Sequence, residues 1–204
     1  MASGLFCGTL TGMPTGNPIQ IACQQVLVDD SSVFSIQWTD LAPELAAGLT
    51  PEQLLAHYLA AIKRMTVGLI QPLASPEGIA FKLFGRLPLL CFLPPEREGY
   101  GLALRICGGM LVQQDHCDRG ELLLQCEPLA DGRIRVSLRL SDYCPLLLGS
   151  QRPSIVRRWL YRLTQAALHR LVTIRFLVVL YRQLGGTAHR IEKVRVRVVE
   201  GRNT

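Results

Sequence analysis

The residues best suited to metal chemistry occur together in one short segment. Asp115-His116-Cys117-Asp118 combines three side-chain types that bind zinc. Adjacent residues in a turn rarely converge on one ion, and the chain has no CxxC or HxxxH pair to complete a set of four ligands. We therefore interpret the segment, with Gly120, as the turn of a hairpin, and we expect no metal site and no cofactor.

A second candidate for chemistry is Asp142-Tyr143-Cys144-Pro145, which follows a predicted strand. Cys144 could act as a nucleophile if His116, His169 or His189 lay close to it. The seven cysteines are scattered along the chain, so we interpret them as reduced thiols packed like small apolar side chains. We assign no catalytic residue. The enzyme class that stays open is an acyl-ester or thioester hydrolase acting through Cys144 or His116.

The C-terminal third of the chain is strongly basic. Residues 143–204 hold eleven Arg and one Lys against two acidic residues. Such a block can face phosphates, anionic headgroups or the acidic part of the same protein. Within it, Arg157, Arg175 and Arg182 fall on one narrow stripe of a predicted helix. We select these three arginines, with Trp159 nearby, as candidate ligand-binding residues.

A long helix over residues 152–185 is predicted to carry these side chains, ending at Gly185-Gly186. Its first half has a polar side that includes His169, and its second half is apolar almost all round except at Arg175. A membrane-spanning helix needs about 20 apolar residues, whereas no uncharged run here exceeds seven. We therefore expect a helix that is packed on several sides at the centre of the fold and does not cross a membrane.

A second helix is predicted over residues 50–71. Thr50 is a good N-cap, Pro51 suits the first helical position, and Gln53 completes a capping box. Apolar residues then recur at spacings of three and four as far as Leu69, and Pro72 is predicted to end the helix.

The remaining segments alternate like strands. We predict N-terminal strands within residues 1–40, an antiparallel meander over 78–142 and a final strand over 189–200. In RIRVSLRL, residues 133–140, arginines alternate with apolar residues, as expected for a sheet with one face in water. The final strand repeats this pattern, and two such cationic strands would avoid pairing with each other. Residues 1–204 are predicted to form a single α+β domain.

The order of these elements resembles the helix-grip fold of the START and polyketide-cyclase-like families. It also resembles, less well, the hot-dog thioesterases. The resemblance is one of element order and involves no shared motif; the strand after residue 186 departs from the helix-grip pattern, and no hot-dog catalytic carboxylate can be assigned. It implies an antiparallel curved sheet packed around the long C-terminal helix, with an apolar cavity between them.

The composition is richer in apolar residues than that of a typical soluble domain. Hydrophobic residues make up 49% of the chain and charged residues 19%, against about 25% charged residues in a typical soluble domain. We expect a non-enzymatic binding protein for an apolar, anionic-headed small molecule or lipid. The alternative is a protein-interaction or assembly subunit, such as a homodimer, that buries its apolar surface between chains.

Further expectations concern partners and location. An anionic membrane surface would suit the basic segment as an additional partner. Nucleic acid is not favoured, because the aromatic residues among the arginines take core-facing helical positions. The first residues, MASGLFCGTLTG, lack the basic and long apolar regions of a secretion signal, so we expect a cytoplasmic protein.

Overall fold

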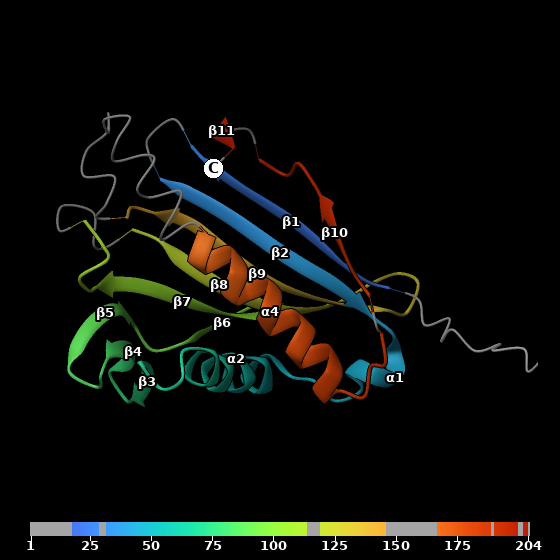
Figure 1. Cartoon of the computed structure of the whole chain (residues 1–204), viewed down its shortest axis with the longest axis horizontal. Coiled ribbons are helices and arrows are strands. Elements are labelled where there is room, and N and C mark those ends of the chain that lie inside the picture. The colour runs from blue at the N-terminus through green and yellow to red at the C-terminus, as the bar shows by residue number, and fades with distance from the viewer. Residues whose placement is uncertain are drawn as a thin grey trace, which may run out of the picture.

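A large, mostly antiparallel sheet makes up most of this single-domain α+β protein (Figure 1). The structure is a computed structural model, and it describes residues 18–28, 32–113, 119–145, 167–188, 190–199 and 202–203. The elements in chain order are β1 (Ile19–Leu27), β2 (Val33–Leu41), α1 (Pro43–Ala46), α2 (Pro51–Met65), β3 (Ile70–Ser75), β4 (Gly78–Leu83), β5 (Leu87–Phe92), β6 (Glu96–Glu98), β7 (Gly101–Gly108), β8 (Glu121–Pro128), β9 (Ile134–Tyr143), α4 (Ala167–Gln183), β10 (Ile191–Arg195) and β11 (Arg202–Asn203).

The strand order in the sheet is β10-β1-β2-β9-β8-β7-β5-β4-β3, with β6 paired to β7 and β11 paired to β1. Among the described strands, β1 and β10 form the parallel pair, and the others pair in antiparallel fashion. From β3 to β9 the chain runs as a meander, and β9 then pairs with β2. The two N-terminal strands therefore extend the sheet beyond the last strand of the meander.

The two faces of the sheet have opposite character. On β9, Val136 and Leu138 are fully buried and belong to the same core as residues of α2 and α4. Both helices lie on this one face of the sheet (Figure 1). Arg135 and Arg139 alternate with the buried residues and so point to the other face. The alternation of β9 thus produces a two-layer protein with its core between helices and sheet.

Helix α2 begins as the sequence indicates. The Thr50 hydroxyl accepts a hydrogen bond from the Gln53 backbone N–H at 3.2 Å, and the Gln53 side chain accepts one from the Thr50 N–H at 3.0 Å. Pro51 occupies the first turn. This reciprocal capping box satisfies donors that would otherwise lack partners at the start of the helix.

The predicted end of this helix at residue 71 is wrong, because α2 ends at Met65. The Thr66 hydroxyl donates to the Ile62 carbonyl at 2.8 Å, and the Gly68 N–H donates to the Lys63 carbonyl at 2.8 Å with φ at 76°. These bonds terminate the helix locally. Pro72 then lies inside β3, at the edge of the sheet, where proline is tolerated.

Helix α4 is described from Ala167 to Gln183, and the earlier part of the predicted helix, residues 152–166, lies outside the described residues. Gly185 has φ at 93°, and the Gly186 N–H donates to the Tyr181 carbonyl at 2.9 Å, which ends the helix. The helix is buried over Ile174, Phe176, Leu177, Val178 and Leu180. It is apolar on most sides because the sheet covers one side and α2 another.

The predicted final strand corresponds to β10, which is shorter than predicted and pairs with β1. It covers Ile191–Arg195 rather than 189–200, because the chain then leaves the ladder and binds the Gln24 side chain. The Gln24 amide oxygen accepts hydrogen bonds from the N–H groups of Val198 and Val199. Strands β1 and β2 separate β10 from β9, so the two cationic strands do not pair with each other.

Four elements were not predicted from the sequence, namely α1, β3, β6 and β11. Helix α1 covers only one turn, and β6 lies in the segment PPEREG, whose proline and glycine residues are typical of a turn. Residues Glu96–Glu98 pair with β7 through their backbone while all three side chains stay exposed. A strand of this length has no side-chain alternation from which to predict it.

Candidate functional site

A cavity of about 150 Å³ lies between the two helices and the sheet. Helix α2 contributes Tyr58 and Ile62 to its wall, and α4 contributes His169 and Val172. The rest of the lining is mostly apolar and comes from β4, β5, the neighbouring strands and the turns beside them. It includes Phe81, Leu89, Leu90, Phe92, Ile106, Leu122 and Leu140. This composition is typical of small-molecule sites, which are apolar with a few placed polar groups.

Aromatic pairs fix two parts of the wall. The rings of Tyr58 and Phe176 meet edge to face at 5.2 Å and join α2 to α4. The rings of Phe81 and Phe92 meet in the same way at 5.2 Å and join β4 to β5. Edge-to-face pairs add stabilisation beyond the area that they bury, so the helix side and the strand side of the cavity are each held by a defined contact.

Four side chains with polar groups line the cavity, and two of them are already bonded. The Thr66 hydroxyl donates to the Ile62 carbonyl, and the Tyr143 hydroxyl donates to the Leu111 carbonyl at 2.7 Å. The side chains of Tyr58 and His169 make no hydrogen bond to any residue that the structure describes. These two groups are therefore available to a ligand.

Desolvation keeps both of these groups neutral. Burial lowers the pKa of His169 to about 4, because the charged imidazolium is poorly solvated there. Burial also raises the pKa of the Tyr58 hydroxyl well above its usual range. At pH 7 the cavity wall therefore offers a neutral imidazole and a phenol, and no charged side chain among its described residues.

The structure does not bring the predicted ligand-binding residues together at this cavity. Arg175 and Arg182 are exposed on α4, on the side away from the core, and neither lines the cavity. Arg157 and Trp159 lie outside the described residues. The prediction that His169 lies on a polar side of the helix is wrong, since the residue is half-buried and lines the cavity.

Tyr58 and His169 were missed as site residues for a physical reason. Tyr58 fits the apolar stripe of α2, and nothing in its spacing separates a phenol over a cavity from one in a packed core. His169 sits near the start of the described part of α4, where arginines surround it in the sequence. The available signal was helical spacing: Tyr58 lies three residues after Leu55 and four before Ile62, and His169 lies seven residues before Phe176, so each shares a face with apolar residues of its helix.

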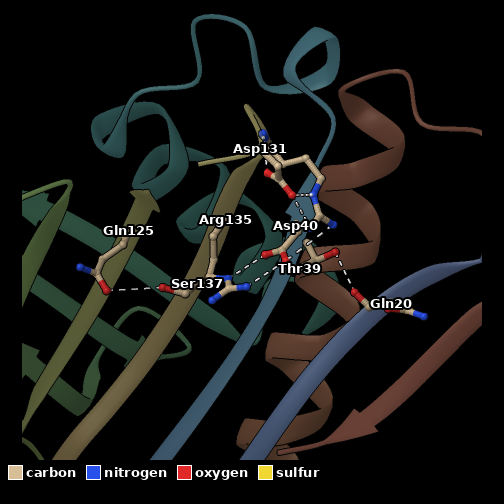
Figure 2. Close-up of polar contacts among 8 residues, drawn as sticks. Gln20, Thr39, Asp40, Gln125, Asp131, Arg135 and Ser137 are labelled. Carbon is tan, nitrogen blue, oxygen red and sulfur yellow. Dashed lines mark hydrogen bonds and ion pairs between the residues drawn. The ribbon is translucent and has the colours of Figure 1, made fainter. Parts of the chain in front are cut away.

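The arginines of the outer sheet face pair with acidic residues of the same protein, as Figure 2 shows. Arg135 binds Asp40 through two hydrogen bonds of 2.7 and 2.9 Å, and its guanidinium lies 5.2 Å from the centre of the Trp38 ring. Arg133 binds Asp131 at 2.7 Å. These carboxylates raise the pKa of both arginines, chiefly through the hydrogen bonds. The guanidinium groups of Arg133 and Arg135 are therefore not an open anion site.

A second hollow, of about 600 Å³, lies near Trp38, Tyr181 and Val194. Its lining is more polar, but the Asp40 carboxylate and the Arg133 guanidinium in its wall are engaged with charged neighbours. The smaller cavity is the better candidate, because its wall combines an apolar surface with two polar groups that no described residue satisfies.

The two candidates for chemistry do not form a site in the described residues. Cys144 is buried, and its thiol donates to the Asp142 carbonyl at 3.7 Å. The segment Asp115–Asp118 lies outside the described residues. Within the described ranges, no group of His, Cys, Asp and Glu could hold a metal ion, and no helix is long and apolar enough to cross a bilayer.

Comparisons with known proteins add little to this geometry. No protein-family model matches the chain, and no curated protein matches it. The crystal structure of CalU16 from Micromonospora echinospora is similar with a TM-score of 0.30 and 13% sequence identity. The match covers 62% of this chain and 70% of CalU16. A likeness this slight assigns no function.

Proposed function

We propose that the protein is a non-enzymatic binding protein that holds an apolar small molecule, or the apolar end of a lipid, between its sheet and its helices. The observation that carries this proposal is the cavity lined by apolar side chains, with Tyr58 and His169 unbonded in its wall. An unsatisfied polar group in an apolar cavity costs free energy, and a ligand that bonds to it removes this cost.

We further propose a helix-grip-like arrangement, with a curved antiparallel sheet packed around the C-terminal helix. The sheet order supports it, since β9 returns to pair with β2 and the meander runs from β3 to β9. The contacts of α4 with β1, β2 and α2 also support it. A hot-dog arrangement fits the structure less well than a helix-grip arrangement, because two strands, β1 and β2, precede the capped helix α2 and a second long helix, α4, follows the meander.

The chemistry of the wall favours a neutral polar group on the ligand. A cavity of about 150 Å³ holds a benzene-sized ring. His169 is neutral and Tyr58 is protonated, so a hydroxyl or carbonyl group fits better than a carboxylate. An anionic head would have to lie outside the cavity, where Arg175 and Arg182 are the exposed candidates on α4.

The proposal can be tested with two single-ring probes. We expect benzyl alcohol to raise the melting temperature in a saturable way and benzoate to have a much smaller effect, because the wall offers benzoate no positive charge. Before the titration, native and denatured mass spectrometry of the purified protein would reveal any ligand that is carried through purification.

A matched pair of variants locates the binding. Val172→Phe would fill the cavity and abolish the effect of benzyl alcohol, whereas Val179→Phe adds the same bulk on α4 at a residue that does not line it. Binding that survives Val172→Phe in a folded protein would show that the ligand occupies another site.

The second candidate function is an assembly subunit, such as a homodimer. Large apolar side chains that stay exposed, among them Leu171 on α4 and Met110, favour it. A mass from light scattering that doubles with rising concentration would support this alternative. A constant monomer mass together with probe binding would support the ligand-binding function instead. The cytoplasmic location stays a prediction.

A further inference from the structure

One end of the molecule displays large apolar side chains on two neighbouring turns. We call this end the apolar tip and define it as Val67 and Leu69 in the turn after α2, with Phe84 and Leu87 around the turn between β4 and β5. The exposed fraction is 90% for Val67 and 66% for Phe84, and Leu69 and Leu87 are also exposed. Side chains of this kind are rarely displayed together without a partner.

The two turns lie against each other. The Phe84 N–H donates to the Leu69 carbonyl at 2.8 Å. The adjoining residues Ile70 and Leu83 are partners in the ladder, and Leu83 is in turn opposite Leu87. The four apolar side chains of the tip therefore come from one small area.

The backbone at the tip is strained in a way that burial does not explain. Val67 has φ at 52° and Phe84 has φ at 51°, in the left-handed region that β-branched and bulky residues avoid. Neither side chain gains a buried position from this conformation, because both project into solvent. Tight turns impose both conformations: the Arg86 N–H donates to the Leu83 carbonyl around Phe84, and the Gly68 N–H donates to the Lys63 carbonyl around Val67. These turns therefore display a valine and a phenylalanine to solvent at positions where glycine or asparagine is usual.

Basic residues surround the apolar tip. Lys63 and Arg64 end α2, Lys82 lies on β4, and Arg86 lies in the β4–β5 turn. None of the four forms an ion pair with another described residue, in contrast to Arg97, which binds Glu52. Between Glu52 and Glu96 the sequence contains one acidic residue, Glu77. It lies in the turn between β3 and β4, at the opposite end of that hairpin.

We propose that the apolar tip and its basic rim dock onto the surface of an anionic lipid bilayer. Val67 and Phe84 would enter the boundary between headgroups and acyl chains, and the four cations would bind acidic headgroups. Membrane-surface binding combines these two contributions, apolar insertion and attraction of basic residues to anionic lipid. The unpaired charges favour a bilayer over a second copy of this chain, whose identical basic rim would repel them.

The docking surface also adjoins the cavity. Ile62, Thr66 and Ile70 line the cavity and lie directly beside the tip along the chain. The inference goes beyond the proposed ligand-binding function and does not depend on it, since docking and cavity occupancy are measured separately.

Sedimentation with vesicles tests the docking. We expect the protein to bind phosphatidylcholine vesicles that contain about 30% phosphatidylserine and to bind pure phosphatidylcholine at least tenfold more weakly. Two variants should each reduce binding to the anionic vesicles at least tenfold. The first is the double variant Val67→Asn with Phe84→Asn. The second is the quadruple variant Lys63→Gln, Arg64→Gln, Lys82→Gln and Arg86→Gln. Binding of the wild type should also fall as salt is raised.

A matched pair of tryptophan variants tests the orientation. Phe84→Trp would place a fluorophore at the tip, and Leu93→Trp would place one at an exposed apolar position outside it. On anionic vesicles that contain brominated lipid, we expect quenching of the Phe84→Trp signal above the wild-type background. The Leu93→Trp signal should not be quenched above that background.

Control variants separate this surface from others. Leu93→Asn with Tyr100→Asn, and Arg190→Gln with Arg195→Gln, change exposed residues outside the tip and should leave vesicle binding unchanged. The proposal is overturned if the Arg190 and Arg195 variant abolishes vesicle binding while the tip variants still bind, or if the wild type binds neither kind of vesicle. It is also overturned if the tip variants only convert a dimer to a monomer, which would make the tip an interface between copies. Melting curves confirm that each variant is folded.

Discussion

His169 couples the cavity to pH through its unusual environment. The folded protein keeps the imidazole neutral down to about pH 4, whereas the unfolded chain binds a proton near the ordinary pKa of 6.5. Between these values the unfolded state holds more protons than the folded state. Lowering the pH from 6.5 to about 4 therefore decreases the free energy of unfolding. Below about pH 4 the protonation of His169 causes no further decrease.

We expect His169→Gln to reduce the acid sensitivity of the protein. The wild type should lose up to about 3 kcal/mol more unfolding free energy than the variant between pH 7 and pH 4, because only the wild type carries this proton linkage. Urea unfolding at a series of pH values measures the difference. If the two proteins lose stability in parallel over this range, the imidazole is not desolvated in the folded state.

The turn between α2 and β3 is the element in which local strain is most evident. Val67 holds a left-handed conformation in which a β-branched side chain is unfavourable. Asparagine tolerates this conformation, so we expect Val67→Asn to raise the free energy of unfolding by about 1 kcal/mol. Urea denaturation measures this change. Leu69→Asn, in the same turn, is the control and should give no such gain; equal effects of the two substitutions would argue against strain at Val67.

The same turn shows which part of a helix can be predicted from sequence. The start of α2 depends on Thr50, Pro51 and Gln53, which act on each other within a few residues. Its end depends on the Thr66 hydroxyl bonding back to the helix and on the conformation of Gly68, while the apolar spacing continues to Leu69. A helix boundary can be predicted where its local signals agree, as at the start of α2. At its end, the apolar spacing favoured a longer helix, whereas Thr66 and Gly68 ended it.

At the scale of the whole molecule, prediction was limited by contacts distant in sequence. The alternation of β9 indicates which residues share a face, but not that β2 lies beside it or that β10 pairs with β1. The cavity depends on the relative positions of α2, α4 and β5. Tyr58 and His169 could therefore not be assigned to one site before these elements were placed.

The last strand protects an edge of the sheet. A chain shortened to end at Ala188 would leave β1, with the sequence IQIACQQVL, without its partners β10 and β11. Unpaired edges with apolar side chains template association between chains. We expect this truncated protein to form larger species as its concentration rises, measured by size-exclusion chromatography with light scattering. The chain of 204 residues is the comparison, and a truncated protein that stays monodisperse and equally stable would show that β10 does not protect the edge.

The pairing of β1 with β10 also affects the order in which the sheet can form during synthesis. Gln20 and Glu192 lie 172 positions apart along the chain, yet their side chains meet at 3.3 Å. A ribosome adds about 5–20 residues per second, so roughly 10–30 s separate the synthesis of these two strands. Strand β1 therefore gains this partner only after β10 has been synthesised. The rate of translation between β1 and β10 sets how long each newly made copy carries this open edge among its neighbours.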